Sequence, residues 1–139
     1  MVFTDGELAY LATQQLGRLA TVQPNGTLQN NPVGFHYNAR LETIDIGGRN
    51  MESSQKFRNV RNNGQVALVF DDIASVQPWR VRCIEIRGLA EALTDVLDSA
   101  TGSGDAIIRV HPRRIISWGI DPEHLSLGKR NVPESATGR

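Results

Sequence analysis

Cysteine, aromatic residues and net charge are all scarce in this sequence. Among 139 residues there is one cysteine, Cys83, so neither an intrachain disulfide nor a cysteine-rich zinc site can form. The 15 basic and 15 acidic side chains cancel, and the total charge therefore gives no reason to expect a nucleic acid or an anionic membrane as a partner. A reduced, cytoplasmic setting is the simplest fit, and any phosphate site must be local.

Long apolar runs are also missing. No segment approaches the ~20 apolar residues that a membrane-spanning helix needs, and the first ten residues lack the basic and apolar regions of an export signal. His36, His111 and His124 are scattered, without the paired spacing of a zinc-binding helix. No nucleophile, base and orienting acid are grouped in the sequence. We expect no membrane association and no metal site.

The chain is long enough, and with 40% hydrophobic residues apolar enough, for one compact domain. Thr4 and Glu7 have the spacing of a capping box, and apolar residues at helical intervals up to Leu16 predict a first helix. Residues 17–38 predict a hairpin around a Pro-Asn-Gly-Thr turn, and residues 41–48 predict a third strand that ends at a glycine pair.

The second half of the chain is also rich in predicted strands. A helix capped by Ser53 or Ser54 is expected up to Gly64, followed by strands at 65–70 and 80–93 and a loop or short helix at 94–105. A final strand over 106–120 is interrupted near Pro112, which an edge or a bulge tolerates. The fold is predicted to be mainly β with short helices, a small barrel of six antiparallel strands over residues 1–125. Residues 126–139 are a tail with little to bury, which either joins a dimer surface or lacks order.

Residues 47–63, GGRNMESSQKFRNVRNN, concentrate four cations in an otherwise neutral chain. Gly47 and Gly48 permit close backbone approach, and a helix N-terminus offers unpaired N–H groups. Arg49, Ser54 and Lys56 add side-chain donors within a few residues. Two interpretations are equally supported by these residues alone, a site for one phosphate and a hydrated helix whose cations face the solvent.

Six segments together resemble the pyridoxamine 5'-phosphate oxidase-like split-barrel family, in its small actinobacterial branch of flavin and deazaflavin oxidoreductases. The segments are GRLATVQPNGT, NNPVGFHYN, IDIGG, SSQKFRNVRNNGQVALVFDDI, PWRVRCIEIRGLAEAL and RRIISWGI. The resemblance implies an FMN-binding type of barrel that works as a homodimer, with two cofactor sites at the interface. It favours the phosphate interpretation, with Gly47, Gly48, Arg49, Ser54, Gln55 and Lys56 as the cradle.

Other site residues follow only from this resemblance. Pro32, Val33, Gly34 and Phe35 would run beside the flavin ring, although Phe35 could equally be a core aromatic. Arg80, Arg82 and Cys83 would lie near a cofactor, and Trp118 would reach one from across the dimer. For Trp118, packing at the interface is an equal alternative, and a strand cysteine is more often an inert core thiol.

The resemblance implies hydride transfer to a small organic substrate, chemistry that the cofactor carries. Coenzyme F-420 is the first choice and FMN the second, since Arg58, Arg61, Arg80 and Arg82 could meet the acidic tail of the deazaflavin. Vitamin B6 oxidation is not expected, because the tail after Trp118 is short and Cys83 stands where that oxidase has a glutamine. The alternatives are a protein that binds flavin, deazaflavin or haem without turnover, and an interaction domain without a ligand.

Overall fold

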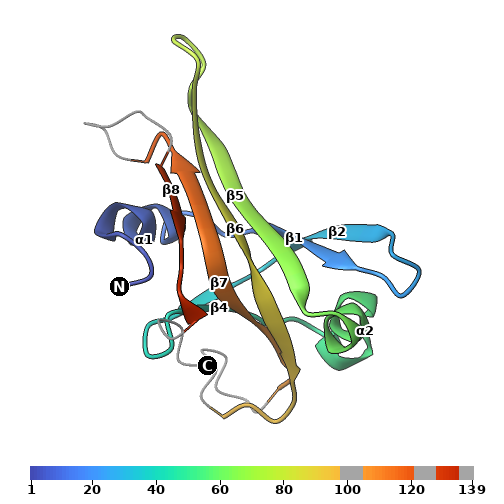
Figure 1. Cartoon of the computed structure of the whole chain (residues 1–139). Helices are drawn as coiled ribbons and strands as arrows, with labels where there is room; N and C mark the ends of the chain where they lie inside the picture. The colour runs from blue at the N-terminus through green and yellow to red at the C-terminus, as the bar shows by residue number, and fades with distance from the viewer. Residues whose placement is uncertain (98–104, 121–127, 135–139) are drawn as a thin grey trace.

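The computed structural model describes residues 1–97, 105–120 and 128–134. These form one antiparallel sheet of eight strands with two short helices and a 3-10 turn (Figure 1). In chain order the elements are α1 (Asp5–Leu11), β1 (Gly17–Val22), β2 (Leu28–Val33), β3 (His36–Asn38), β4 (Thr43–Ile46), η1 (Met51–Ser53), α2 (Gln55–Asn62), β5 (Gln65–Ser75), β6 (Arg80–Leu93), β7 (Ile107–Trp118) and β8 (Gly128–Asn131). No helix within the described ranges is long and apolar enough to cross a membrane.

The order of strands explains how the sheet curls into a split barrel. Along the sheet the order is β2-β1-β5-β6-β7-β4-β3, with β8 pairing with β7 outside this path. The strands β2 and β3 therefore lie at opposite ends of the order, yet only Gly34 and Phe35 join them in the chain. So short a link requires the two ends of the sheet to approach each other, but β2 and β3 do not pair and the barrel stays open.

The prediction of a mainly β, antiparallel split barrel is confirmed, and the count of six strands is wrong. The second arm of the first hairpin is broken at Gly34 and Phe35 into β2 and β3, and the C-terminal tail adds β8. The tail also buries Val132, contrary to the expectation that it has little to bury. The first helix ends at Leu11, and Leu16 is exposed, because the chain turns into β1 after one short helix. Of the loop or short helix predicted at 94–105, residues 98–104 lie outside the described residues.

The core lies inside the curved sheet and is closed by the helices. Phe57, Phe70 and Phe3 are its largest fully buried side chains, and α2 presents Phe57 and Val60 to it, as the sequence predicted. Asn59 on the same helix donates hydrogen bonds to the hydroxyl of Thr21 at 3.0 Å and to the amide oxygen of Gln29 at 2.9 Å. These bonds fix α2 against β1 and β2.

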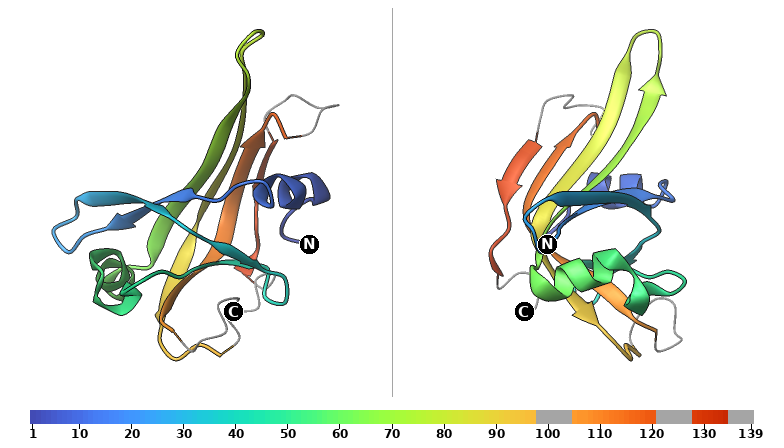
Figure 2. Two further views of the ribbon diagram at one scale, coloured as in Figure 1. Left: turned by 180° about the vertical axis from the view of Figure 1, so that it is seen from behind. Right: turned by 90° about the vertical axis from the view of Figure 1, so that its right-hand side faces the viewer.

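The helices α1 and α2 lie toward different ends of the sheet, and the hairpin of β5 and β6 projects beyond the other strands (Figure 2). The strand β7 runs between these regions and pairs with β6, β4 and β8. Its 12 residues span roughly 35 Å at ~3.3 Å per residue. A register shift opposite Arg87 and Gly88 accommodates Pro112, so of the two predicted settings, an edge or a bulge, the structure has the bulge.

Candidate functional site

A hollow of about 610 Å³ lies just before β7, at the predicted phosphate segment. It is lined by Gly48, Arg49, Asn50, Met51, Glu52, Ser53, Asp105 and Ala106. We call it the cradle hollow. The turn that forms it follows β4 directly, because Gly48 has a φ of 152° and Asn50 a left-handed φ of 57°. These two residues reverse the chain within a few positions, and the 3-10 turn η1 then leads into α2.

The N-terminus of α2 begins where the lining of the cradle hollow ends. Ser54 is its N-cap, accepting a hydrogen bond from the backbone N–H of Phe57 and donating one to the carbonyl of Met51 at 2.6 Å. Within the described residues, the backbone N–H groups of Gln55 and Lys56 have no acceptor. Unpaired N–H groups in the first turn of a helix are the donors that anions bind.

Arg49 and Lys56 are the cations available to an anion here. Neither makes a hydrogen bond or an ion pair with any described residue. Arg49 is exposed and Lys56 is half-buried. Gln55 is engaged instead, because its amide bonds Asn59 and Arg58 along the helix. Of the predicted phosphate ligands, Arg49, Lys56 and the α2 amides therefore fit a phosphate best.

Two carboxylates, those of Glu52 and Asp105, also line the cradle hollow. They would repel an anion placed at the centre of the hollow. A phosphate is therefore better accommodated on the side of Arg49 and the first turn of α2.

The segment predicted to run beside the ring joins β2 to β3. Val33 is buried and Pro32 and Gly34 are exposed. The ring of Phe35 packs on the ring of Phe70 with centroids 4.4 Å apart. Phe35 is thus partly a core aromatic, the alternative that the sequence left open. A Cβ added at its neighbour Gly34 would meet no atom within 4 Å, so the backbone there is open to an approaching ligand.

A second hollow, of about 570 Å³, lies at the other end of β7 beside the β5–β6 hairpin. It is lined by Ala74, Trp79, Arg80, Val81, Arg82, Trp118 and Gly119. We call it the tryptophan hollow. Trp79 is 64% exposed and Trp118 is 40% exposed. Gly119 has a φ of +69°, and a Cβ there would meet the carbonyl oxygen of Val81 at 2.3 Å, so only glycine lets β7 end this close to β6.

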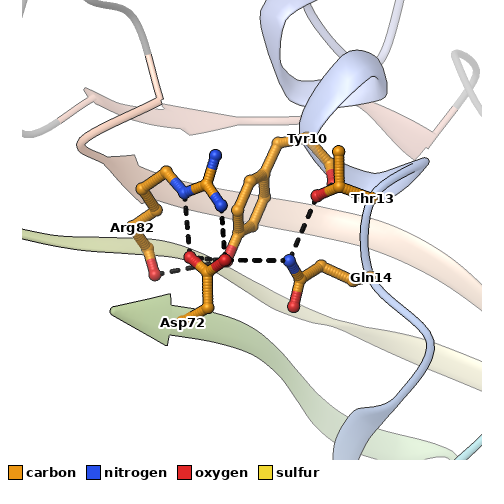
Figure 3. A network of polar contacts seen from close by, with 5 residues as sticks. All are labelled: Tyr10, Thr13, Gln14, Asp72 and Arg82. Carbon is orange, nitrogen blue, oxygen red and sulfur yellow. Dashed lines mark hydrogen bonds and ion pairs between the residues drawn. The ribbon is translucent and has the colours of Figure 1, made fainter. Parts of the chain in front are cut away.

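Arg82, one wall of the tryptophan hollow, is neutralised by Asp72 (Figure 3). Its Nε donates to Asp72 Oδ1 at 2.9 Å and its Nη2 donates to Asp72 Oδ2. The hydroxyl of Tyr10 donates to the same carboxylate at 3.2 Å, and the Arg82 guanidinium lies 4.9 Å from the Tyr10 ring centre. Hydrogen bonding from Arg82 lowers the pKa of Asp72, and burial, with Asp72 second, raises the pKa of Tyr10.

The sequence missed Tyr10 and Asp72 as parts of this network. They meet Arg82 across separations of 72 and 10 residues, and no local motif marks such a contact. Arg80 differs from Arg82, since it is exposed and has no partner within the described ranges.

Cys83 is buried on β6, opposite Asp71 and Trp118 in the sheet. Burial, followed by the charges of Asp71 and Glu85, raises the pKa of its thiol to about 11. The thiol therefore stays protonated at neutral pH and is not a nucleophile.

Two sets of predicted site residues thus lie at opposite ends of β7. Gly47 to Lys56 lie along or next to the cradle hollow, and Arg80, Arg82 and Trp118 line the tryptophan hollow. A separation of roughly 35 Å along β7 is far longer than the ribityl chain between a flavin ring and its phosphate. The ring and the phosphate of one flavin therefore do not span both sets within a single chain.

Comparisons with known proteins agree with this fold. The pyridoxamine 5'-phosphate oxidase model matches residues 3–119. The 5a,11a-dehydrotetracycline/5a,11a-dehydrooxytetracycline reductase of Streptomyces rimosus subsp. rimosus is 46% identical over 142 residues, covering 100% of this chain and 99% of that protein. A solved F-420 reductase is 27% identical, with a TM-score of 0.53, over 70% of this chain and 86% of its own. A conserved hypothetical protein of Mycobacterium tuberculosis shares the fold, with a TM-score of 0.66 at 20% identity over 92% of this chain and 94% of its own.

Proposed function

We propose that this chain, which belongs to the pyridoxamine 5'-phosphate oxidase family, is a reductase that transfers a hydride from a deazaflavin cofactor to an unsaturated organic substrate. The similar Streptomyces protein is a dehydrotetracycline reductase, and the similar solved structure is an F-420 reductase. Oxidoreductase chemistry is therefore the shared feature of the relatives, and compounds of the dehydrotetracycline type are the first substrates to test.

The observation that carries the proposal is the set of free donors at the start of α2. Arg49, Lys56 and two backbone N–H groups lie beside the cradle hollow without partners among the described residues. A phosphate would satisfy all of these groups, with charge-assisted hydrogen bonds from both side chains. A merely hydrated helix would leave no reason for the tight turn at Gly48 and Asn50 that gathers them.

The site is proposed to be completed by a second copy of the chain. One face of the sheet carries Val69 and Glu85 side by side near its centre, and both remain partly exposed. Their neighbours on the other face, Leu68 and Ile84, are fully buried. A homodimer that covers the exposed face would bring the tryptophan hollow of one chain toward the cradle hollow of its partner. One cofactor could then contact both hollows, although they lie far apart along β7 of a single chain.

A bound deazaflavin or flavin would supply the hydride chemistry itself. The residues of the chain bind, orient and shield. Arg49 and Lys56 would hold the phosphate, Pro32 to Phe35 would flank the ring, and Trp118 of the second chain would shield it from water. The Cys83 thiol would not act as a nucleophile, because burial raises its pKa to about 11 and keeps it protonated at neutral pH.

Coenzyme F-420 is proposed over FMN, and the cations that extend from the cradle support this choice. Arg58 and Arg61 are exposed on α2, and each can meet an acidic tail that FMN does not have. Turnover is proposed over simple storage of the cofactor, because the tryptophan hollow offers about 570 Å³ for a substrate.

The test adds reduced coenzyme F-420 and 5a,11a-dehydrotetracycline to the purified protein and follows oxidation of the deazaflavin. Oxidation that needs both protein and acceptor is expected. A parallel binding titration uses FMN. Tight binding of FMN without binding of the deazaflavin would overturn the choice of cofactor, and binding of neither would favour an interaction domain without a ligand.

A further inference from the structure

The tryptophan hollow gathers both tryptophans of the chain at one place. The sequence contains two, Trp79 and Trp118, and both line this hollow with large exposed fractions. They come from different elements, since Trp79 lies at the tip of the β5–β6 hairpin and Trp118 ends β7. Exposed large aromatics that converge on one hollow are characteristic of a binding site rather than of an ordinary surface.

The charge of the hollow comes from Arg80. Arg82 also lines it, but its guanidinium is paired with Asp72 and stacked near Tyr10. Arg80 is exposed and without a partner in the described part of the chain. The hollow therefore combines flat aromatic surfaces with one available planar cation, which suits a ligand that is both planar and anionic.

The hollow is braced from behind, so its walls are held in place before a ligand arrives. Arg82 is fixed by Asp72, whose carboxylate also accepts bonds from Tyr10 and Gln14 (Figure 3). Next to Trp118, the hydroxyl of Ser117 donates to the buried carboxylate of Glu7 at 3.0 Å. Such preorganisation lowers the entropy that binding would otherwise cost.

We infer that the tryptophan hollow binds the organic substrate as a planar, multi-ring anion, stacked on Trp79 and Trp118 with its negative oxygen on Arg80. That this ligand is the substrate rests on the proposed reductase function. The volume of about 570 Å³ is that of a site for a multi-ring molecule, and a phosphate alone would leave both indole rings without a partner. Trp79 and Arg80 are then the residues that select the substrate.

The test uses the two tryptophans as the only indole fluorophores of the chain. The protein without cofactor is titrated with anthracene-2-carboxylate and, separately, with the uncharged anthracene-2-carboxamide. The carboxylate should quench the tryptophan fluorescence and bind about 10-fold tighter than the amide, the worth of one charge-assisted hydrogen bond. The variants Trp79→Phe and Trp118→Phe should each keep part of the quenching, because the remaining indole also faces the ligand.

Arg80→Gln should abolish the preference for the carboxylate, whereas Arg61→Gln, an exposed arginine on α2, should keep it. Both side chains are exposed, so neither change should unfold the protein. The inference is overturned if neither probe quenches, if the two probes bind equally, or if Arg80→Gln keeps the preference. It is also overturned if fluorescence changes only with protein concentration, which would show that a second copy fills the hollow.

The outcome of the fluorescence titration does not depend on the reductase assay, since the titration is done without cofactor. Selective binding of the carboxylate together with no turnover of any deazaflavin would overturn the proposed function and leave the hollow a site for planar anions. Turnover that Arg80→Gln leaves unchanged in KM and kcat would uphold the reductase and overturn the substrate assignment.

Discussion

The two ends of β7 carry hollows of similar volume and different construction. The cradle hollow, about 610 Å³, is built from a backbone turn with Arg49 and Lys56 close by. The tryptophan hollow, about 570 Å³, is built from side chains of two strand ends and is braced by partly buried hydrogen bonds. A turn with free N–H groups suits a phosphate, and paired indoles suit a ring. The comparison indicates one hollow for the cofactor phosphate and the other for the substrate.

Removing both free cations of the cradle should give the largest effect. The double variant Arg49→Ala/Lys56→Ala should weaken binding of a phosphate-bearing cofactor about 100-fold, since each charge-assisted bond contributes about 1.5 kcal/mol or more. Isothermal titration calorimetry measures this, with Lys129→Ala, an exposed cation on β8, as the control that should bind normally. Quenching in the tryptophan hollow should stay unchanged. An unaltered cofactor affinity would show that the phosphate lies elsewhere.

The bracing of the tryptophan hollow can be broken at Glu7. This buried carboxylate accepts hydrogen bonds from Arg130, from Ser117 and from the N-cap residue Thr4. Glu7→Gln should lower the free energy of unfolding by about 2 kcal/mol at pH 7, because Arg130 loses its counter-charge. Urea denaturation measures the loss, and Glu52→Gln at the exposed cradle end should cause little change.

The same variant gives a pH dependence with a defined sign. Burial by itself would raise the pKa of Glu7, but the hydrogen bonds and charge of Arg130, with Thr4 and Ser117, lower it below 4.5. The stabilisation by the ionised carboxylate is therefore complete above pH 4.5 and is lost as the pH falls through the lowered pKa of the folded state. The difference in stability between wild type and Glu7→Gln should shrink over that interval. A difference that grows toward acid pH would contradict the assignment.

A comparison of Gly119 with Gly26 separates the cost of backbone strain from the cost of steric contact. Gly26 and Gly119 both have positive φ values, but a Cβ at Gly26 meets nothing within 4 Å, whereas one at Gly119 meets the carbonyl of Val81. Gly119→Ala should therefore be less stable than Gly26→Ala by about 1 to 2 kcal/mol. It should also weaken probe binding in the tryptophan hollow, measured by fluorescence, and leave cofactor binding at the cradle intact. Equal losses for the two variants would remove the steric argument.

Cys83 should give the smallest effect. Its pKa of about 11 keeps the thiol protonated, so Cys83→Ala should change kcat/KM by no more than about twofold at neutral pH. Steady-state rates measured between pH 6 and pH 9 should follow the same pH profile in the wild type and in Cys83→Ala, because the thiol does not titrate in this range. A large loss of activity would return Cys83 to the site.

Local patterns in the sequence predicted the elements whose contacts are themselves local. The capping box of Thr4 and Glu7, the Ser54 cap and the bulge at Pro112 all depend on neighbouring residues, and each is present. The strand β8 was missed because it exists only through pairing with β7. Residues 36–38 were predicted as the end of a longer strand, whereas they form the separate strand β3, which pairs with β4. Helical spacing of apolar residues alone also predicted that the first helix continues to Leu16. The helix instead ends at Leu11, and the chain enters β1 at Gly17.

The candidate site also has one part that depends on local sequence and one part that depends on distant contacts. The cradle is one continuous segment, so its residues could be chosen from the sequence. The tryptophan hollow depends on the register of β6 with β7 and on contacts of α1 across more than 60 residues. Trp79 carries no local signal that would separate it from an ordinary hairpin tip, and the pairing of Arg82 with Asp72, which leaves Arg80 as the available cation, appears only in the fold.

The most direct test of the account asks whether one chain's cradle works with its partner's tryptophan hollow. The variant Arg49→Ala/Lys56→Ala should lose activity at the cradle, and Trp118→Ala/Arg80→Gln should lose activity at the tryptophan hollow. When equal amounts are unfolded and refolded together, shared sites across a two-fold dimer should restore about a quarter of the wild-type reductase rate, because half the dimers are mixed and each has one intact site. A mixture that stays as inactive as the separate variants would contradict the account.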